Sequence, residues 1–204
     1  MRGSYDARFP VSAAWALEFA PVNVSVVFVQ PRGSDFLCIG SKSWFFDSPP
    51  ECIAQSKTAY PWRVSTHILP PEDPPRIWQE LFEDLCIYNV EHAPKLDDGR
   101  RMLLTQRFLS RLEVDTTARP WDAENNELLV DSLNGYRVKE LASHHDVFTT
   151  NVMGTHEQYL TRALEHFVAH DWAKPERGRP WGPAPDYSQH DKAVIGGASF
   201  NARR

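Results

Sequence analysis

The amino-acid sequence predicts an α/β protein in which a mixed β-sheet is flanked by helices. Three observations carry this prediction: three consecutive β-rich runs near the N-terminus, a later alternation of helical and extended segments, and an amphipathic helix after residue 155. In 204 residues, 42% are hydrophobic and 24% are charged, which is the balance of a globular protein with a single sizeable core. We therefore expect one folded domain over residues 1–170 and a Pro/Gly-rich tail over residues 171–204.

The first three strands are predicted within residues 11–46. Apolar side chains occupy the odd positions from Val11 to Phe19, and small or polar side chains occupy most of the even positions. A second β-rich run covers residues 22–30 and stops at the turn sequence of residues 31–34. A third run begins at Asp35 and continues toward Phe46. Three strands in a row indicate an antiparallel meander.

Beyond the meander, helical and extended segments alternate. This alternation implies that the next strand is added parallel to its neighbours. The last helix is the best defined, because Thr155-His156-Glu157-Gln158 is a capping box followed by one apolar stripe. The resulting order fits an RNase H-like layer architecture. Further helices are expected at residues 50–59, 75–85, 98–112 and 126–140, and further strands at residues 63–69 and 87–90.

Four segments of the chain occur in the order that they have in one protein family. Trp15-Ala16-Leu17 resembles a strand usually written Trp-Asp-Leu-Gly, and residues 67–73 resemble a Leu-Pro-His-Asp segment. Residues 133–137 resemble a Leu-x-x-Tyr-Arg stretch, and the helix after Thr155 resembles a Ser-His-x-x-Asp-Ala helix. This ordered set, over roughly residues 5–170, resembles the C-terminal nuclease domain of the terminase large subunit, the DNA-packaging motor of tailed bacteriophages. The resemblance implies an RNase H-like fold.

The resemblance also implies a metal site. In that family the nuclease holds two divalent cations, Mg²⁺ or Mn²⁺, about 4 Å apart between acidic residues from three separated points of the fold. The first acid falls on Ala16 and the third on Tyr159, or on Arg162 if the alignment moves by one helical turn. Glu72 occupies the second position. The candidate catalytic residues are Glu72, Asp73 and Glu18, with Glu72 and Asp73 as the candidate metal ligands.

Two of these positions limit the chemistry, because neither Ala16 nor Tyr159 offers a carboxylate. Glu18 lies on the sheet face of Ala16 but about 7 Å farther along the strand, which is too far for a simple replacement. The two acids of the last helix, Glu157 and Glu165, are expected on a solvated face. His67, which precedes the Glu72 segment, is a candidate to face the cleft.

Two functions are consistent with this sequence. One is a catalytically degenerate domain that acts as a scaffold or interaction module in viral DNA packaging. The alternative is an active divalent-metal-dependent endonuclease that cuts concatemeric viral DNA during packaging. Whether the chain is an enzyme therefore stays open. The sequence contains no Gly-x-x-x-x-Gly-Lys-[Ser/Thr] phosphate loop, so ATP hydrolysis by that route is not expected.

The uneven distribution of charge along the chain indicates which kinds of partner the C-terminal tail could bind. The net charge is −5, but residues 172–204 hold six basic and three acidic side chains. Through this tail we expect contacts with double-stranded DNA or with other terminase or portal proteins. No apolar run approaches the roughly 18 residues of a membrane span, and the first residues lack the apolar stretch of a secretory signal. We expect a cytoplasmic location in the host cell and no membrane contact.

Overall fold

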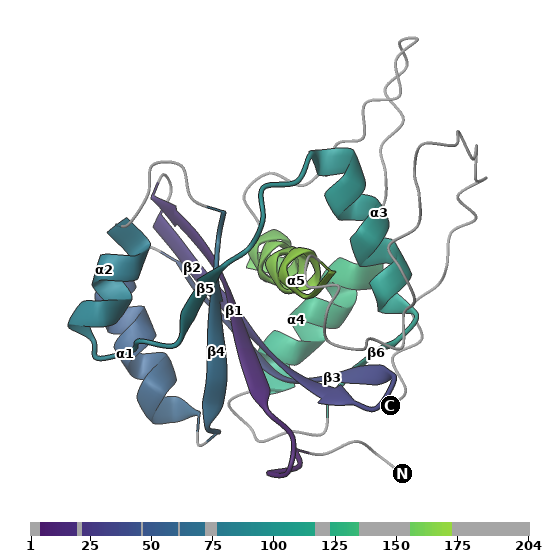
Figure 1. Cartoon of the computed structure of the whole chain (residues 1–204), viewed down its shortest axis with the longest axis horizontal. Coiled ribbons are helices and arrows are strands. Elements are labelled where there is room, and N and C mark those ends of the chain that lie inside the picture. The colour runs from purple at the N-terminus through teal and green to yellow at the C-terminus, as the bar shows by residue number, and fades with distance from the viewer. Residues whose placement is uncertain are drawn as a thin grey trace, which may run out of the picture.

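A six-stranded mixed sheet separates two layers of helices (Figure 1). The computed structural model describes residues 5–19, 22–45, 47–60, 62–71, 77–116, 123–134 and 156–172. The first three strands, β1 (Val11–Phe19), β2 (Val22–Arg32) and β3 (Asp35–Phe45), pair antiparallel and confirm the predicted meander. Three further strands, β4 (Val64–Leu69), β5 (Val90–His92) and β6 (Leu112–Val114), complete the sheet, and the strand order across it is β5-β4-β1-β2-β3-β6.

The remaining elements alternate along the chain. Strand β4 (Val64–Leu69) pairs parallel with β1, as the sequence predicts, and the edge strand β5 pairs parallel with β4. The mixed sheet and its flanking helices thus form the predicted RNase H-like α/β architecture. The other elements are α1 (Pro49–Ala59), α2 (Ile77–Asp84), β5 (Val90–His92), α3 (Asp98–Leu109), β6 (Leu112–Val114), α4 (Ala123–Asn134) and α5 (His156–Trp172).

Several boundaries differ from the prediction; α4, for example, begins at Ala123 instead of residue 126. The strand expected at residues 87–90 begins only at Val90, because Cys86 adopts a positive φ of 57° in the turn after α2. The helix expected to reach Leu112 ends at Leu109, where Ser110 is the C-cap, and Leu112 pairs instead with Phe36 in β6. The apolar residues Phe108 and Leu112 are four positions apart, so helical spacing alone includes both. The capping box at Thr155, residues 135–140 and the tail from residue 173 lie outside the described residues.

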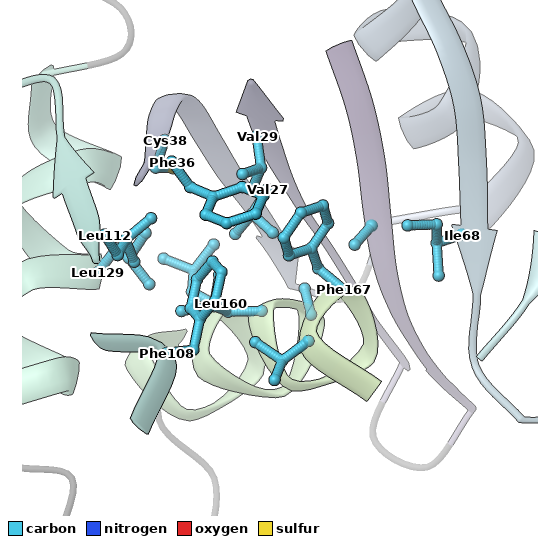
Figure 2. Close-up of a cluster of buried hydrophobic side chains, with 14 of the residues drawn as sticks. Val27, Val29, Phe36, Cys38, Ile68, Phe108, Leu112, Leu129, Leu160 and Phe167 are labelled. Atoms are coloured by element: carbon cyan, nitrogen blue, oxygen red, sulfur yellow. The ribbon is translucent and has the colours of Figure 1, made fainter. Parts of the chain in front are cut away.

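The alternation of β1 places its side chains on two different cores. The odd positions Val11, Ala13, Trp15 and Leu17 belong to a cluster with α1 and α2, which we call the α1/α2 face. The even positions Ala14 and Ala16 belong to a second cluster covered by α3, α4 and α5, which we call the α5 face. Figure 2 shows side chains of the α5 face filling the space between the sheet and the helices. Both faces of the sheet are therefore covered.

No helix in the described part of the chain combines the length and the apolar character that crossing a membrane requires.

Candidate functional site

The first predicted acid position lies inside the core. Ala16 is 1% exposed and pairs with Ser25 on β2, which in turn pairs with Ser43 on β3. The three side chains form one row across the α5 face. At this row the sheet presents a methyl group and two hydroxyls instead of a carboxylate.

The row beside Ala16 is a buried polar network that sequence reasoning missed. The hydroxyls of Ser25 and Ser43 lie 2.7 Å apart, and Ser25 also donates to Oδ1 of Asn23 at 3.0 Å. Nδ2 of Asn23 donates to the carbonyl oxygen of Trp44 at 3.1 Å. Asn23 and Ser25 are both fully buried. These neutral groups bond to one another, so they supply no charge to compensate a metal ion. The signal in the sequence is the polar alternation Val22-Asn23-Val24-Ser25 in β2.

The structure places Tyr159 over a different strand from Ala16. Its ring lies edge-on to Phe45 of β3, with the two ring centroids 5.8 Å apart. Phe45 pairs with Asn23, and Asn23 pairs with Glu18 of β1. Two strand spacings, about 10 Å, therefore separate the part of β3 beneath Tyr159 from β1.

The remaining predicted residues are placed only in part. Glu18 lies near the end of β1 opposite Asn23, and its side chain is outside the described set. Glu72 and Asp73 also lie outside the described residues, just beyond Pro71. Their predicted roles as ligands stay predictions.

The last helix carries a buried carboxylate that we expected on a solvated face, and that expectation is wrong for Glu165. Its side chain is 2% exposed, with Oε2 at 2.7 Å from Nε of Arg101 on α3 and at 3.0 Å from Nη1 of Arg162. A buried carboxylate requires such partners, because an unpaired charge in the core costs several kcal/mol. Spacing alone did not reveal Glu165, since its partner Arg101 is more than 60 residues away in sequence.

Two histidines, the partly buried His67 and the buried His166, contact Trp15 from opposite faces of the sheet. On the α1/α2 face, Nε1 of Trp15 donates to Nδ1 of His67 at 3.2 Å, and the His67 ring packs on Phe82. On the α5 face, Nδ1 of His166 lies 2.7 Å from the carbonyl oxygen of Trp15. Burial lowers the pKa of His67 to about 4 and that of His166 to about 4 as well. His67 therefore lies on the face away from Ala16, and both rings are neutral at pH 7.

A further pair joins α5 to the edge of the sheet. Nε2 of His170 lies 3.0 Å from Oε2 of Glu91 on β5. The neighbouring His92 contacts the carbonyl oxygen of Pro70 through Nδ1 at 3.1 Å. The first contact holds β5 against α5, and the second ties the end of β5 to Pro70, the residue that follows β4.

The described residues do not fit a two-metal centre. Nowhere among them do three His, Cys, Asp or Glu side chains come together as ligands for a metal ion. The carboxylate of Glu165 on α5 already has two guanidinium partners. Hard divalent cations need several oxygen ligands with uncompensated negative charge, and this part of the chain offers none in one place.

The mixed sheet with helices on both faces defines the fold class of the structure, an RNase H-like α/β domain. Among solved structures, the chain is similar to the large terminase nuclease from thermophilic phage G20c, crystallised with bound cobalt, at a TM-score of 0.55 and 11% identity. The match covers 82% of this chain and 84% of that one. The expected resemblance is thus confirmed at the level of the fold.

A second structure, the large terminase from the thermophilic bacteriophage D6E, gives a TM-score of 0.48 at 10% identity over 78% of this chain and 39% of that one. No protein-family model matches the sequence, and no curated protein does so either.

Proposed function

We propose that this chain is a terminase-nuclease-like domain that serves viral DNA packaging as a scaffold or interaction module, without two-metal catalysis. The observation that supports this most directly is the buried triad of Glu165, Arg101 and Arg162. Two guanidinium groups neutralise the α5 carboxylate, and their positive charge opposes the entry of a divalent cation. The apolar Ala16 and the neutral hydroxyls of Ser25 and Ser43 support the same conclusion from the strand side.

The direct test is metal binding by the whole chain. Isothermal titration with Mn²⁺ should show no site tighter than millimolar, because Glu72 and Asp73 alone cannot offset the dehydration of a hard cation. The alternative, an active endonuclease, predicts Mn²⁺-dependent cleavage of plasmid DNA that disappears in Glu72→Ala. That result would overturn the scaffold proposal.

The position of the missing ligands can be tested by restoring them. The double variant Ala16→Asp/Arg162→Asp adds a carboxylate on β1 and one on the helix while removing a competing cation. Repulsion among the new acids should destabilise the metal-free protein, so Mn²⁺ should raise the melting temperature of this variant but not that of the parent.

The matched variant Ala16→Asp/Tyr159→Asp tests the unshifted alignment. Its new helix acid replaces a ring that packs on β3, so the thermal response to Mn²⁺ distinguishes the two alignments. If neither double variant gains metal-dependent stability while both remain folded, the alignment with the family's acid positions is wrong.

We further propose that residues 173–204, which follow the end of α5 at Trp172, form a separate, cationic partner-binding tail behind the folded domain. The excess of positive charge in this segment suits double-stranded DNA or an acidic surface of another terminase or portal protein. Removing residues 173–204 should abolish retention of the protein on double-stranded DNA at low salt and leave the melting temperature unchanged. Unchanged DNA retention after the truncation would assign the contact to the folded domain.

A further inference from the structure

An open pocket with a volume of about 710 Å³ lies at the end of the sheet where β1 and β4 begin. Its lining includes Tyr5, Arg8, Phe9, Arg63, Ser65 and Asn89. The strand β1 runs from Val11, at this end, to Ala16, a distance of about 16 Å. The pocket is therefore separate from the predicted metal positions. Its size is within the range of about 300–1,000 Å³ that small-molecule sites occupy.

One wall of the pocket is a turn that the protein core holds in place. Gln30 is fully buried, and its amide makes three hydrogen bonds to the turn of residues 6–9. Oε1 accepts from the backbone N–H of Asp6 at 3.0 Å, and Nε2 donates to the carbonyl oxygens of Asp6 and Phe9 at 2.7 and 3.0 Å. The turn is closed by the bond from the Phe9 N–H to the Asp6 carbonyl at 3.1 Å. Because the Gln30 amide makes all three bonds within the protein, this wall of the pocket is already ordered in the absence of a ligand.

The opposite wall is fixed by side-chain bonds to the backbone of the strands. The hydroxyl of Ser65 donates to the carbonyl oxygen of Val11 at 2.8 Å, and Nδ2 of Asn89 donates to that of Val64 at 3.1 Å. Ser65 and Asn89 are otherwise exposed. Hydrogen bonds within the protein thus hold both walls in place without a ligand. A ligand can contact only the lining groups that take no part in these bonds.

The lining of the pocket also offers cationic and aromatic groups. Arg63 is exposed and has no ion-pair partner among the described residues. Arg8 uses Nε and Nη2 on the carboxylate of Asp6, which leaves Nη1 available. No lining residue carries a carboxylate. Tyr5 and Phe9 are each 36% exposed. The Phe9 ring lies 6.0 Å from the guanidinium carbon of Arg8 and 5.6 Å from that of Arg32, and the Tyr5 ring packs on Trp62.

Asp6, which belongs to the turn that forms a wall of the pocket, does not repel an anion, because its carboxylate is already paired with arginine. Asp6 binds Arg8 and lies 3.6 Å from Arg32, and the hydrogen bonds from Arg8 hold the pKa of its carboxyl at about 2. Asp6 therefore stays ionised at every ordinary pH and orients Arg8.

From this geometry we propose that the pocket binds a nucleotide unit, with its phosphate at Arg63 and Arg8 and its base against the rings of Tyr5 and Phe9. Guanidinium groups prefer phosphate oxygens, and aromatic rings stack on bases of any sequence. The unit is either a free nucleoside monophosphate or one nucleotide of a single strand, since both present the same chemistry.

The test uses the full chain and calorimetric titration with four probes: deoxyadenosine monophosphate, deoxyadenosine, a short 5′-phosphorylated single-stranded oligodeoxyadenylate, and an oligoglutamate peptide. We expect the oligonucleotide to bind, and deoxyadenosine to bind at least about tenfold more weakly than any phosphorylated probe that binds. Binding of the monophosphate as well as the oligonucleotide assigns a free nucleotide, and binding of the oligonucleotide alone assigns a strand. Either result supports the proposal.

Matched variants locate the binding. Arg63→Gln should weaken the phosphorylated probes about tenfold, whereas Arg107→Gln, an exposed arginine on α3, should bind like the parent. Phe9→Leu should weaken the oligonucleotide about tenfold while retaining the melting temperature of the parent. Equal affinity of Arg63→Gln and parent, equal affinity for deoxyadenosine, tighter binding of oligoglutamate, or no binding of any probe at millimolar concentration would each overturn the proposal.

Discussion

The two faces of the central sheet are built from the same strands but from different chemistry. The α1/α2 face is an aromatic core in which Phe28 packs on Tyr60 and Trp62, with ring centroids 4.3 and 5.3 Å apart. The α5 face has an aromatic group of its own around Phe36, but buried polar groups lie beside it. These include the Asn23 network and the ion pairs of Glu165.

The α5 face is thus the more polar of the two cores. Buried polar groups add less to stability than apolar packing, and they demand complete sets of partners. The α5 face is also the face on which the resemblance expects metal-binding acids. Its buried polar groups form hydrogen bonds and ion pairs with one another, so they are not available as metal ligands. These contacts are the structural basis for proposing that the domain lacks two-metal catalysis.

Acidification should have the largest effect, because it acts on both faces at once. His67 on the α1/α2 face and His166 on the α5 face have pKa values of about 4, below the value of about 6.5 expected in the unfolded chain. The unfolded state therefore binds more protons between these values, so the stabilisation is fully present above pH 6.5 and is lost as the pH falls toward 4. Each histidine should contribute about 3 kcal/mol of this loss.

Urea denaturation measured across this pH range checks the prediction, and two variants separate the faces. His67→Asn keeps an acceptor for Nε1 of Trp15, and His166→Asn keeps a donor for the Trp15 carbonyl oxygen. Each variant lacks one titrating group, so the free energy of unfolding should fall less steeply with decreasing pH than it does in the parent. A pH dependence unchanged in both variants would contradict the assignment to these histidines.

Removing the largest fully buried side chain of the α1/α2 face should have the next largest effect. Trp15 is fully buried and packs edge-on to Phe82 at 5.2 Å, so Trp15→Ala should lower the free energy of unfolding by about 4 kcal/mol. The matched change on the other face, Leu160→Ala, should cost about 3 kcal/mol. Chemical denaturation compares them. If Trp15→Ala lowered the free energy of unfolding by less than about 1 kcal/mol, packing around Trp15 would not be a main source of stability for the α1/α2 face.

Breaking the buried ion pair should have a smaller effect that is specific to the α5 face. Arg101→Gln leaves Glu165 with Arg162 alone and should cost about 3 kcal/mol. The double variant Arg101→Met/Glu165→Leu removes both charges and should be more stable than the single variant. If the double variant were the less stable of the two, the pair would be a net source of stability instead of a mutually satisfied polar group.

The smallest effect is expected where the α1/α2 face has no spare volume. A Cβ added at Gly40 would meet the ring of Trp62 at 2.7 Å, so Gly40→Ala should cost about 2 kcal/mol by overpacking. Gly33 has open space around it but a φ of 67°, so Gly33→Ala should cost about 1 kcal/mol through the backbone alone. The variant pair Gly40→Ala/Trp62→Leu should recover stability relative to Gly40→Ala. Without such recovery, the cost at Gly40 would not come from Trp62.

Local patterns predicted most of the elements. Alternation in Val11–Phe19 reflects one strand with two covered faces, and the apolar stripe from Tyr159 to Val168 reflects one helix on the sheet. Both patterns arise from the fixed geometry of the backbone, so they can be read without knowing the partner. The apolar pattern wrongly assigned Leu112 to the preceding helix, because β6 has only three residues and is too short to show strand alternation.

The sequence by itself determined the order of strands and helices apart from β6, the parallel addition of β4 and the absence of a carboxylate at Ala16. Only the tertiary structure decided that Glu165 is buried with Arg101, that Trp15 joins His67 and His166 across the sheet, and that Gln30 supports the turn beside Arg8. Each of these contacts links residues more than 20 positions apart. A local pattern records which side of an element faces the core, whereas the identity of the group it meets there depends on how the whole chain packs.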